Sequence, residues 1–435
     1  MGLGSLSMDL AAADRAYLWH PFTQQRGWVD EHPVIVDRAE GTDLIDVEGN
    51  RYIDGVSSLW CNVHGHAHPR IDAAVRGQLS KVAHSTMLGL SHRPAIELAQ
   101  RLVEIAPAGL TRVFYSDSGS TATEIALKMA FQYWRQRGQD RRRFVALRMA
   151  YHGDTIGSVS VGGIDLFHSV YEPLLFDTPK AEPGDVDGMV RLLTAHEGEV
   201  AAVIMEPLVQ GAAGMLVHPP GYLRAVRELC DEHGALLILD EVATGFGRTG
   251  RMFACEHEGV APDLLCLAKG ISGGYLPLAA TLTSERIYDG FLGRHEEFRT
   301  FFHGHTYTGN PLACAAGIAT LDVFREEHTL ERLQPKIELL GELLQPIASH
   351  PAVREVRRRG FMVGIELAEY PLPVRIGHRV TLEARRRGAI IRPLGDVVVL
   401  MPPLAISAEH LRRLVDVTAE AIDAATGAVE LTAAA

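Results

Sequence analysis

The sequence has few cysteines, and no two of them have the spacing of a metal site. Its five cysteines are scattered over 435 residues, and none falls in a C-x-x-C motif. An odd number of dispersed cysteines argues against both a disulfide framework and a zinc site. Because free thiols persist in reducing compartments, we expect a cytoplasmic protein.

Long apolar runs and basic clusters are also scarce. No apolar run approaches the roughly 18 residues of a membrane-spanning helix, and residues 1–19 lack the basic region and apolar core of a secretion signal. The net charge is −12, and dense basic runs are confined to 141–143 and 357–359. We therefore expect neither a membrane nor a nucleic acid as a partner.

What the sequence does contain is a segment, 235–274, around which the rest of the chain is organised. An apolar run, Ala235 to Leu239, ends in two acids, Asp240 and Glu241, and a second run, Leu264 to Ala268, ends in Lys269. Short apolar runs of this kind predict buried parallel strands. The carboxylate and the amine then lie at the carboxyl ends of two strands, where open α/β sheets bind their ligands.

A lysine and an acid in these positions indicate a particular cofactor. A partly desolvated amine such as that of Lys269 can form a Schiff base with an aldehyde. An acid such as Asp240 can keep a pyridine nitrogen protonated, which makes the ring an electron sink. Alone, Asp240 is better explained as a turn cap and Lys269 as a solvated strand end, but together they predict pyridoxal phosphate.

The flanking segments predict an alternation of strands and helices. Strands over 112–115, 144–147 and 201–205 are separated by helical patterns, which predicts a mostly parallel sheet with helices on both faces. A helix that begins near Gly119 and Ser120 can hold a phosphate on its first N–H groups, although an ordinary N-cap explains these residues too.

Further along the chain, Tyr151 follows the strand over 144–147. Its ring can cover one face of a cofactor, or it can be a core tyrosine. An acid, Glu206, follows the strand over 201–205.

Two other patterns suggest different sites and are not favoured. Residues 245–250 match G-x-G-x-x-G, but residues 240–244 separate the strand from the first glycine and no clear helix follows, so we expect no nicotinamide site. His64, His66 and His68 alternate and would share one face of an extended segment, but no carboxylate or thiolate completes a metal ligand set there. We expect a turn that leads into a helix over 70–81.

Longer motifs resemble a known family. LLILDEVATGFGRTG around the acid and CLAKGISGGYLPLAA around the lysine resemble the class III aminotransferases of fold type I. Within them, FQYW and RPLG resemble the branch that makes 7,8-diaminononanoate from 7-keto-8-aminopelargonate in biotin synthesis. The resemblance implies an α/β protein with a mostly parallel central sheet in a large domain and a smaller α+β domain formed by the N- and C-terminal segments.

The resemblance also assigns roles to single residues. Lys269 would form the Schiff base with pyridoxal phosphate and catalyse proton transfer, and Asp240 would contact the pyridine nitrogen. The remaining assignments are Gly119 and Ser120 for the phosphate, Tyr151 for the ring, Thr306 for a neighbouring subunit's phosphate, and Trp60, Tyr151 and Arg392 for the substrate, with Arg392 on its carboxylate. The expected partners are small-molecule substrates and a second copy of the chain, in a homodimer whose active site is shared across the interface.

The resemblance predicts three segments and leaves one question open. Residues 1–60 would contribute to the small domain, 61–325 would form the large domain and 326–435 the C-terminal small domain. Independently of the resemblance, the residue pattern of the C-terminal region predicts a helix over 325–348 and a strand over 390–392. Many members that use S-adenosylmethionine as donor have a tyrosine and a second tryptophan where this chain has Phe22 and Leu59. The donor is therefore S-adenosylmethionine or lysine. An enzyme acting on ω-amino acids or diamines is the alternative function.

Overall fold

The computed structural model describes residues 9–31 and 33–433, with side chains up to residue 427. The expectation about a secretion signal concerns residues 1–19, of which 1–8 lie outside the described residues. Among the described helices, none combines the length and the apolar character that a bilayer crossing requires.

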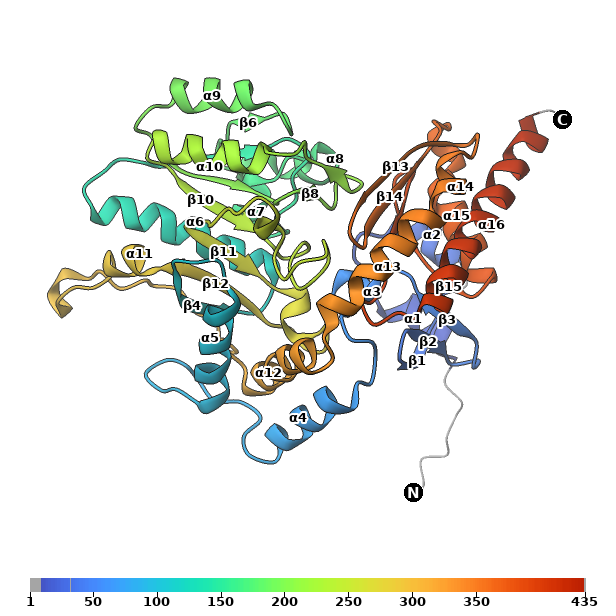
Figure 1. Ribbon diagram of the computed structural model, residues 1–435, viewed down its shortest axis with the longest axis horizontal. Helices are drawn as coiled ribbons and strands as arrows, with labels where there is room; N and C mark the ends of the chain where they lie inside the picture. The colour runs from blue at the N-terminus through green and yellow to red at the C-terminus, as the bar shows by residue number, and fades with distance from the viewer. Residues whose placement is uncertain (1–8, 32, 434–435) are drawn as a thin grey trace.

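A seven-stranded sheet forms the centre of the larger part of the molecule (Figure 1). Its order is β4-β12-β11-β10-β7-β5-β6, and only β12 among them runs antiparallel to its neighbours. The prediction of a mostly parallel sheet is confirmed. The strands are β4 (Leu110–Ser116), β5 (Arg143–Leu147), β6 (Lys180–Ala181), β7 (Val200–Met205), β10 (Leu236–Asp240), β11 (Leu264–Leu267) and β12 (Ala279–Ser284).

Helices cover both faces of this sheet because its strands are apolar on both sides. In β10, Leu236 and Ile238 pack in one cluster with the helix α6, whereas Leu237 and Leu239 pack in another cluster with α10. The helices of this part are α4 (Pro69–Leu79), α5 (Arg93–Ile105), α6 (Gly119–Gln136), α7 (Ile156–Val161), α8 (Asp165–His168), α9 (Val186–Ala195), α10 (Tyr222–Glu232), α11 (Glu285–Asp289) and α12 (Pro311–Glu326). A short hairpin, β8 (Val209–Gln210) and β9 (Leu216–Val217), follows β7.

Segments from the N-terminal and C-terminal parts of the chain lie side by side in the smaller part (Figure 1). There β15 pairs in parallel with β3, joining Ala389 to Ile53, and extends the N-terminal meander to the order β1-β2-β3-β15. A second sheet has the order β13-β14-β17-β16. The strands are β1 (Val36–Glu40), β2 (Asp43–Asp46), β3 (Arg51–Asp54), β13 (Val353–Arg359), β14 (Met362–Leu367), β15 (Ala389–Ile390), β16 (Arg392–Leu394) and β17 (Val397–Leu400).

This arrangement confirms the predicted fold class, in which both chain ends build a smaller α+β unit. Its helices are α1 (Leu10–Tyr17), α2 (Gln25–Asp30), α3 (Ser57–Trp60), α13 (Thr329–Leu343), α14 (Gln345–Ala348), α15 (Ile376–Arg386) and α16 (Ala408–Ala433).

Two predicted elements of the C-terminal segment are divided in the structure. The helix expected over 325–348 is interrupted, because His328 adopts a left-handed φ of 50° and α13 begins only after it. The strand expected over 390–392 is two strands in different sheets, since Ile390 ends β15 and Arg392 begins β16.

Candidate active site

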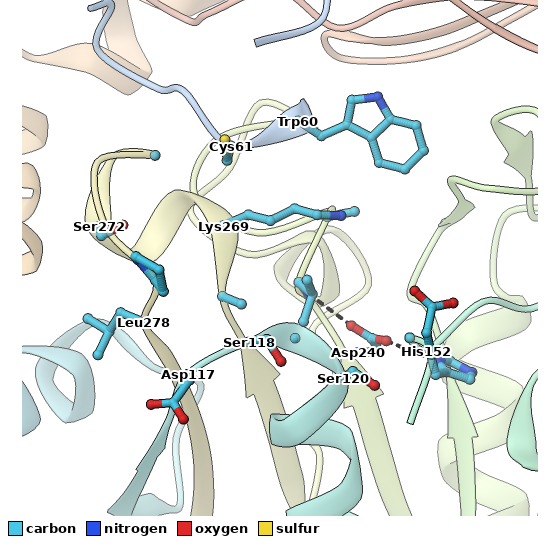
Figure 2. Close-up of a pocket in the computed structure, with 18 of the residues that line it drawn as sticks. Trp60, Cys61, Asp117, Ser118, Ser120, His152, Asp240, Lys269, Ser272 and Leu278 are labelled. Carbon is cyan, nitrogen blue, oxygen red and sulfur yellow. Dashed lines mark hydrogen bonds and ion pairs between the residues drawn. The ribbon is translucent and has the colours of Figure 1, made fainter. Parts of the chain in front are cut away.

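A cavity of about 730 Å³ lies at the carboxyl ends of the central strands. Asp240 is the last residue of β10, Lys269 follows β11 and Glu206 follows β7. Figure 2 shows the Lys269 side chain extending across the cavity, with Trp60 on one side of it and Asp240 and His152 on the other. The lining includes these predicted site residues: Trp60, Gly119, Ser120, Tyr151, Asp240 and Lys269.

Lys269 presents an amine without a partner to this cavity. Its Nζ lies 4.8 Å from the centroid of the Trp60 ring, and no hydrogen bond or ion pair engages it within the described residues. Burial lowers the pKa of Lys269, and the negative charges of Asp240 and Glu206 only partly oppose this. A larger fraction of this amine is therefore neutral, and so nucleophilic, than for an ordinary lysine.

The backbone around Lys269 is held in an unusual conformation. Lys269 has a φ of 47° and Trp60 a φ of 62°, both in the left-handed region that side chains rarely adopt. Such strain persists only where the surrounding structure imposes it. Gly274 allows this packing, because a Cβ there would lie 2.7 Å from the backbone of Cys61. The loop after β11 is thus pressed against the segment that carries Trp60.

Asp240 is fixed on the floor of the cavity. Its Oδ2 lies 2.8 Å from Nδ1 of His152, and its Oδ1 accepts the N–H of Val242 at 3.0 Å. Both Asp240 and His152 are buried. A carboxylate has about four acceptor positions, so Asp240 keeps capacity for a further donor from the cavity. His152 was not predicted from the sequence, where its only signal is its place directly after Tyr151.

A second buried carboxyl group lies beside this pair. Glu206 accepts the N–H of Gly211 at 2.9 Å and that of Tyr151 at 3.4 Å. Burial raises the pKa of Glu206 to about 7, although the neighbouring His152 acts in the opposite direction. Glu206 therefore exchanges its proton near neutral pH, close to Lys269 and Asp240.

The N-terminus of α6 opens into the same cavity. Ser118 caps it, since its Oγ accepts the N–H of Thr121 at 3.3 Å. Ser120 is held by Thr155, whose N–H donates to its Oγ at 3.0 Å. Gly153 permits this approach, because a Cβ there would lie 2.3 Å from Ser120. The first N–H groups of a helix have no carbonyl partner within the helix, so this end is suited to an anion.

Tyr151 belongs to the cavity wall and to an aromatic row. Its hydroxyl donates to Asp154 at 2.8 Å, and burial together with Asp154 raises the pKa of Tyr151. Its ring centroid lies 6.4 Å from that of Phe167, which in turn lies 5.5 Å from Phe22. Phe22, which bears on the choice of amino donor, is thus connected to the cavity through Phe167.

Arg392 lies in a neighbouring cavity of about 450 Å³, which Phe22 and Arg385 also line. It lies close enough to Tyr151 for each group to affect the pKa of the other, so the two cavities adjoin. Burial lowers the pKa of Arg392. Within the described residues, no carboxylate forms an ion pair with it, which leaves its guanidinium available to an acidic ligand.

Thr306 does not line the cavity of its own chain. It lies exposed in a turn in which the N–H of His305 donates to Oγ1 of Thr308 at 2.9 Å. His305 also lies 2.7 Å from Asp117, which precedes α6. A contact between Thr306 and a neighbouring subunit stays a prediction.

The two disfavoured motifs have local structural explanations. In the glycine-rich loop, Arg248 is fully buried and donates to the carbonyls of Pro402 at 2.8 Å and Asn62 at 2.7 Å. After Gly250 the chain forms a short 3-10 helix, Ala254–His257, in place of the long helix of a dinucleotide fold.

The three alternating histidines reach three different partners. His64 contacts the carbonyl of Thr320 at 3.1 Å, His66 contacts Asp54 at 2.9 Å and His68 contacts Glu327 at 3.0 Å. They lead into α4, as the sequence predicts.

Comparisons with known proteins agree on one family. Residues 25–422 match the family model described as aminotransferase class-III. The chain is 61% identical over 449 aligned residues to a protein of Nitratidesulfovibrio vulgaris named adenosylmethionine-8-amino-7-oxononanoate aminotransferase, with 97% of this chain and 83% of the relative covered.

Solved structures show the same likeness. A crystal structure of the enzyme of that name from Methanocaldococcus jannaschii superposes with a TM-score of 0.94 at 46% identity, covering 95% of this chain and 98% of the other. An amine transaminase from an uncultivated Pseudomonas species, solved in its PLP-bound form, has a TM-score of 0.89 at 35% identity and covers 94% of this chain and 99% of its own.

Proposed function

The chain belongs to the class-III aminotransferases, and we propose that it transfers an amino group to 8-amino-7-oxononanoate, the ketone in its relatives' name, in biotin synthesis. It is accordingly a transaminase that depends on pyridoxal phosphate, as its family does. The observation that carries the chemistry is the unpartnered amine of Lys269 in one cavity with the buried carboxylate of Asp240. The choice of ketone is supported by 61% identity along almost the whole chain.

The residues around the cavity fit pyridoxal phosphate. Lys269 offers a free amine, Asp240 keeps acceptor capacity for a pyridinium N–H, and Gly119 and Ser120 lie at a helix N-terminus suited to a phosphate. Tyr151 would cover the ring. When bound, the cofactor supplies an electron sink that stabilises negative charge at the carbon bearing the amino group.

The chain's own groups then manage protons and charge. Nζ of Lys269, partly desolvated, takes the proton from the carbon that carries the donor's amino group. Asp240 is a fixed negative charge in a buried site, oriented by His152 at 2.8 Å, and it favours a protonated pyridine nitrogen. In the second half of the reaction, Lys269 delivers a proton to the former carbonyl carbon of the ketone.

Arg392 and Trp60 would position the ketone. The unpaired guanidinium of Arg392 can hold a carboxylate through two parallel hydrogen bonds. Trp60 lies over Lys269 and would exclude water from the reacting carbon. S-adenosylmethionine is the proposed donor, because it appears in the name of the relatives.

The assembly, the domain limits and the compartment are also proposals. A homodimer is supported by the exposed turn with Thr306 and by large exposed apolar side chains, among them Leu88, Phe302 and Tyr307. The segments 1–60 and 326–435 as one small domain and 61–325 as the large domain are supported by the pairing of β15 with β3. The free cysteines support a cytoplasmic location.

The test uses purified protein loaded with pyridoxal phosphate. The visible absorbance is recorded before and after addition of S-adenosylmethionine or of lysine, without the ketone. 8-Amino-7-oxononanoate is then added, and the diamine product is measured by mass spectrometry. We expect S-adenosylmethionine to change the absorbance and to support diamine formation.

Each other outcome has a definite meaning. A response to lysine alone would assign the donor to lysine and connect Phe22 and Leu59 to that choice. Turnover of ω-amino acids or diamines without any diaminononanoate would replace the proposed substrate. A protein that shows no visible absorbance band after pyridoxal phosphate is supplied would overturn the roles given to Lys269 and Asp240.

A further inference from the structure

A second, strongly basic cavity lies away from the active site. Its volume is about 430 Å³, and it is formed where the glycine-rich loop after β10 meets the turn between β13 and β14 and the helix α13. Three of its lining residues are arginines, and none is an acid. We call it the arginine cavity, and its lining residues are Thr249, Gly250, Arg251, His257, Gln334, Ile337, Arg358, Arg359 and Gly360.

None of the three arginines has a counter-charge among the residues that the structure describes. Arg251 donates to the carbonyl of Glu256 at 3.1 Å and Arg358 to the carbonyl of Ile337 at 3.0 Å, whereas Nε of Arg359 is buried without a partner. Within the described residues, no carboxylate forms an ion pair with any of them. Unpaired guanidinium groups that share a cavity repel one another, and an anion between them would relieve this repulsion.

His257 lines the same cavity as the three arginines. Its Nε2 contacts the carbonyl of Thr249 at 3.1 Å. Burial, followed by the charges of Arg359 and Arg251, lowers the pKa of His257 to about 4. The one acid that acts in the other direction, Glu258, is engaged elsewhere, since its carboxylate accepts the N–H groups of Gly221 and Arg224.

Two other arginines of β13, the strand that carries Arg358 and Arg359, do form ion pairs with carboxylates. Arg354 forms an ion pair with Glu366 at 3.2 Å, and Arg357 pairs with Glu355 at 2.6 Å and also with Glu366. The chain carries 54 acids against 42 basic residues, so carboxylates are not scarce. The absence of acids from the lining of the arginine cavity is therefore a property of this place, not of the composition.

We infer that the arginine cavity is a binding site for a small anion with at least two negative charges, of the phosphate or diphosphate type. Planar guanidinium groups match phosphate oxygens and can donate two hydrogen bonds each. The cavity is large enough for a diphosphate, and Gln334 adds a polar side chain to its wall. Nothing in the transamination requires this site, so it would serve a further ligand.

The experiment is isothermal titration calorimetry of the protein loaded with pyridoxal phosphate, titrated with inorganic pyrophosphate and separately with inorganic phosphate. Loading the protein first keeps the probe out of the N-terminus of α6. We expect saturable binding of one pyrophosphate per chain, tighter than phosphate. The double variant Arg251→Gln/Arg358→Gln should weaken pyrophosphate binding at least about tenfold, because two charge-assisted contacts are lost.

The matched control is Arg354→Gln, which removes the same charge from the same strand outside the cavity. It should leave pyrophosphate binding unchanged. Should the double variant not fold, Arg251→Gln decides alone, since Arg251 is exposed and its one described hydrogen bond joins it to a carbonyl. Absence of saturable binding, or equal weakening by Arg354→Gln and by the cavity variants, would overturn the inference.

Discussion

Asp240 and Glu241 are consecutive acids at the end of β10, yet they belong to different regions. Asp240 faces the active-site cavity and pairs with His152. Glu241 points into the protein, where it accepts the N–H groups of Ala254 at 2.9 Å and Cys255 at 2.8 Å. Successive side chains of a strand point to opposite faces, so Asp240 lies in the cavity whereas Glu241, the next residue, lies in the core. We call these two surroundings the cavity side and the core side.

Two partly buried lysines also differ between the cavity side and the core side, and we expect the largest effect on kcat from replacing the one in the cavity. Lys269 on the cavity side has a free amine, whereas Lys336 donates to the carbonyls of Leu404 and Ile406. Burial lowers the pKa of both, to about 8 for Lys336. Lys269→Ala should reduce kcat at least about a thousandfold, since the variant lacks the group that we propose moves the proton. Single-turnover and steady-state assays of diamine formation measure this.

Lys336→Ala is the matched control for this prediction. It removes hydrogen bonds to two carbonyls, so it should lower Tm while kcat stays within a few-fold of the parent protein. Circular dichroism of both variants reports on folding. If Lys336→Ala impaired kcat as much as Lys269→Ala, the position of Lys269 in the cavity would not explain its importance for turnover.

The acids themselves provide the next test. Asp240→Asn keeps the shape but loses the negative charge that faces the cavity, and we expect a loss of roughly a hundredfold in kcat with little change in Tm. Glu241→Gln should lower Tm with little change in kcat. The Glu241 carboxylate accepts hydrogen bonds from the hydroxyl of Thr244 and from the N–H groups of Ala254 and Cys255. In the variant, one of these donors would face the amide NH2 group and lose its acceptor. Kinetics and thermal melts of the same two preparations are compared. Equal kinetic losses would remove the distinction between the two sides.

The sequence predicted the cavity side better than its supporting contacts. Lys269 and Asp240 were recognisable because apolar runs end at them, and parallel strands bring such ends together. His152 was not recognisable, because its contact with Asp240 joins residues 88 positions apart and no local pattern encodes it.

The elements of the fold also differ in whether the sequence alone predicted them. β12 was missed because Ala279–Ser284 reads AATLTS, in which three hydroxyl residues interrupt the apolar ones, and only its place between β4 and β11 makes it a strand. Gly119 and Ser120 were found from local chemistry at a helix start. The place of Arg392 beside Tyr151 depends on the packing of the C-terminal sheet, which the family resemblance alone suggested. Local patterns thus predicted strand ends and helix starts, and tertiary contacts supplied the rest.

Arginines extend the comparison with a smaller effect. Arg392 on the cavity side has no carboxylate partner in the described chain, whereas Arg248 on the core side donates to two carbonyls. Arg392→Gln should raise KM for the ketone about 10- to 100-fold with little change in kcat, as loss of a charge-assisted contact predicts. Arg248→Gln should lower Tm instead. A KM that is unchanged in Arg392→Gln would place the substrate carboxylate elsewhere.

The smallest effect is a pH dependence of stability that distinguishes the two buried glutamates. Burial raises the pKa of Glu241 from 4.5 to about 6 and that of Glu206 to about 7. Above the unfolded pKa, the folded chain then holds more protons than the unfolded chain, so the free energy of unfolding falls as pH rises. For Glu241 the fall ends near pH 6 and amounts to about 2 kcal/mol, at about 1.36 kcal/mol per pKa unit.

Urea unfolding between pH 4.5 and 8 measures these contributions. Both glutamates contribute to the fall between pH 4.5 and 6, and Glu206 alone contributes between pH 6 and about 7. Glu241→Gln should therefore make the fall below pH 6 less steep and keep the fall between pH 6 and 7. Glu206→Gln should also make the fall below pH 6 less steep, but it should leave stability nearly constant above pH 6. Because Glu206 lies in the active-site cavity, its variant should also shift the pH profile of kcat, whereas Glu241→Gln should not. Two variants with the parental slope would show that neither carboxyl group is protonated by burial, and the contrast between the cavity side and the core side would then rest on geometry alone.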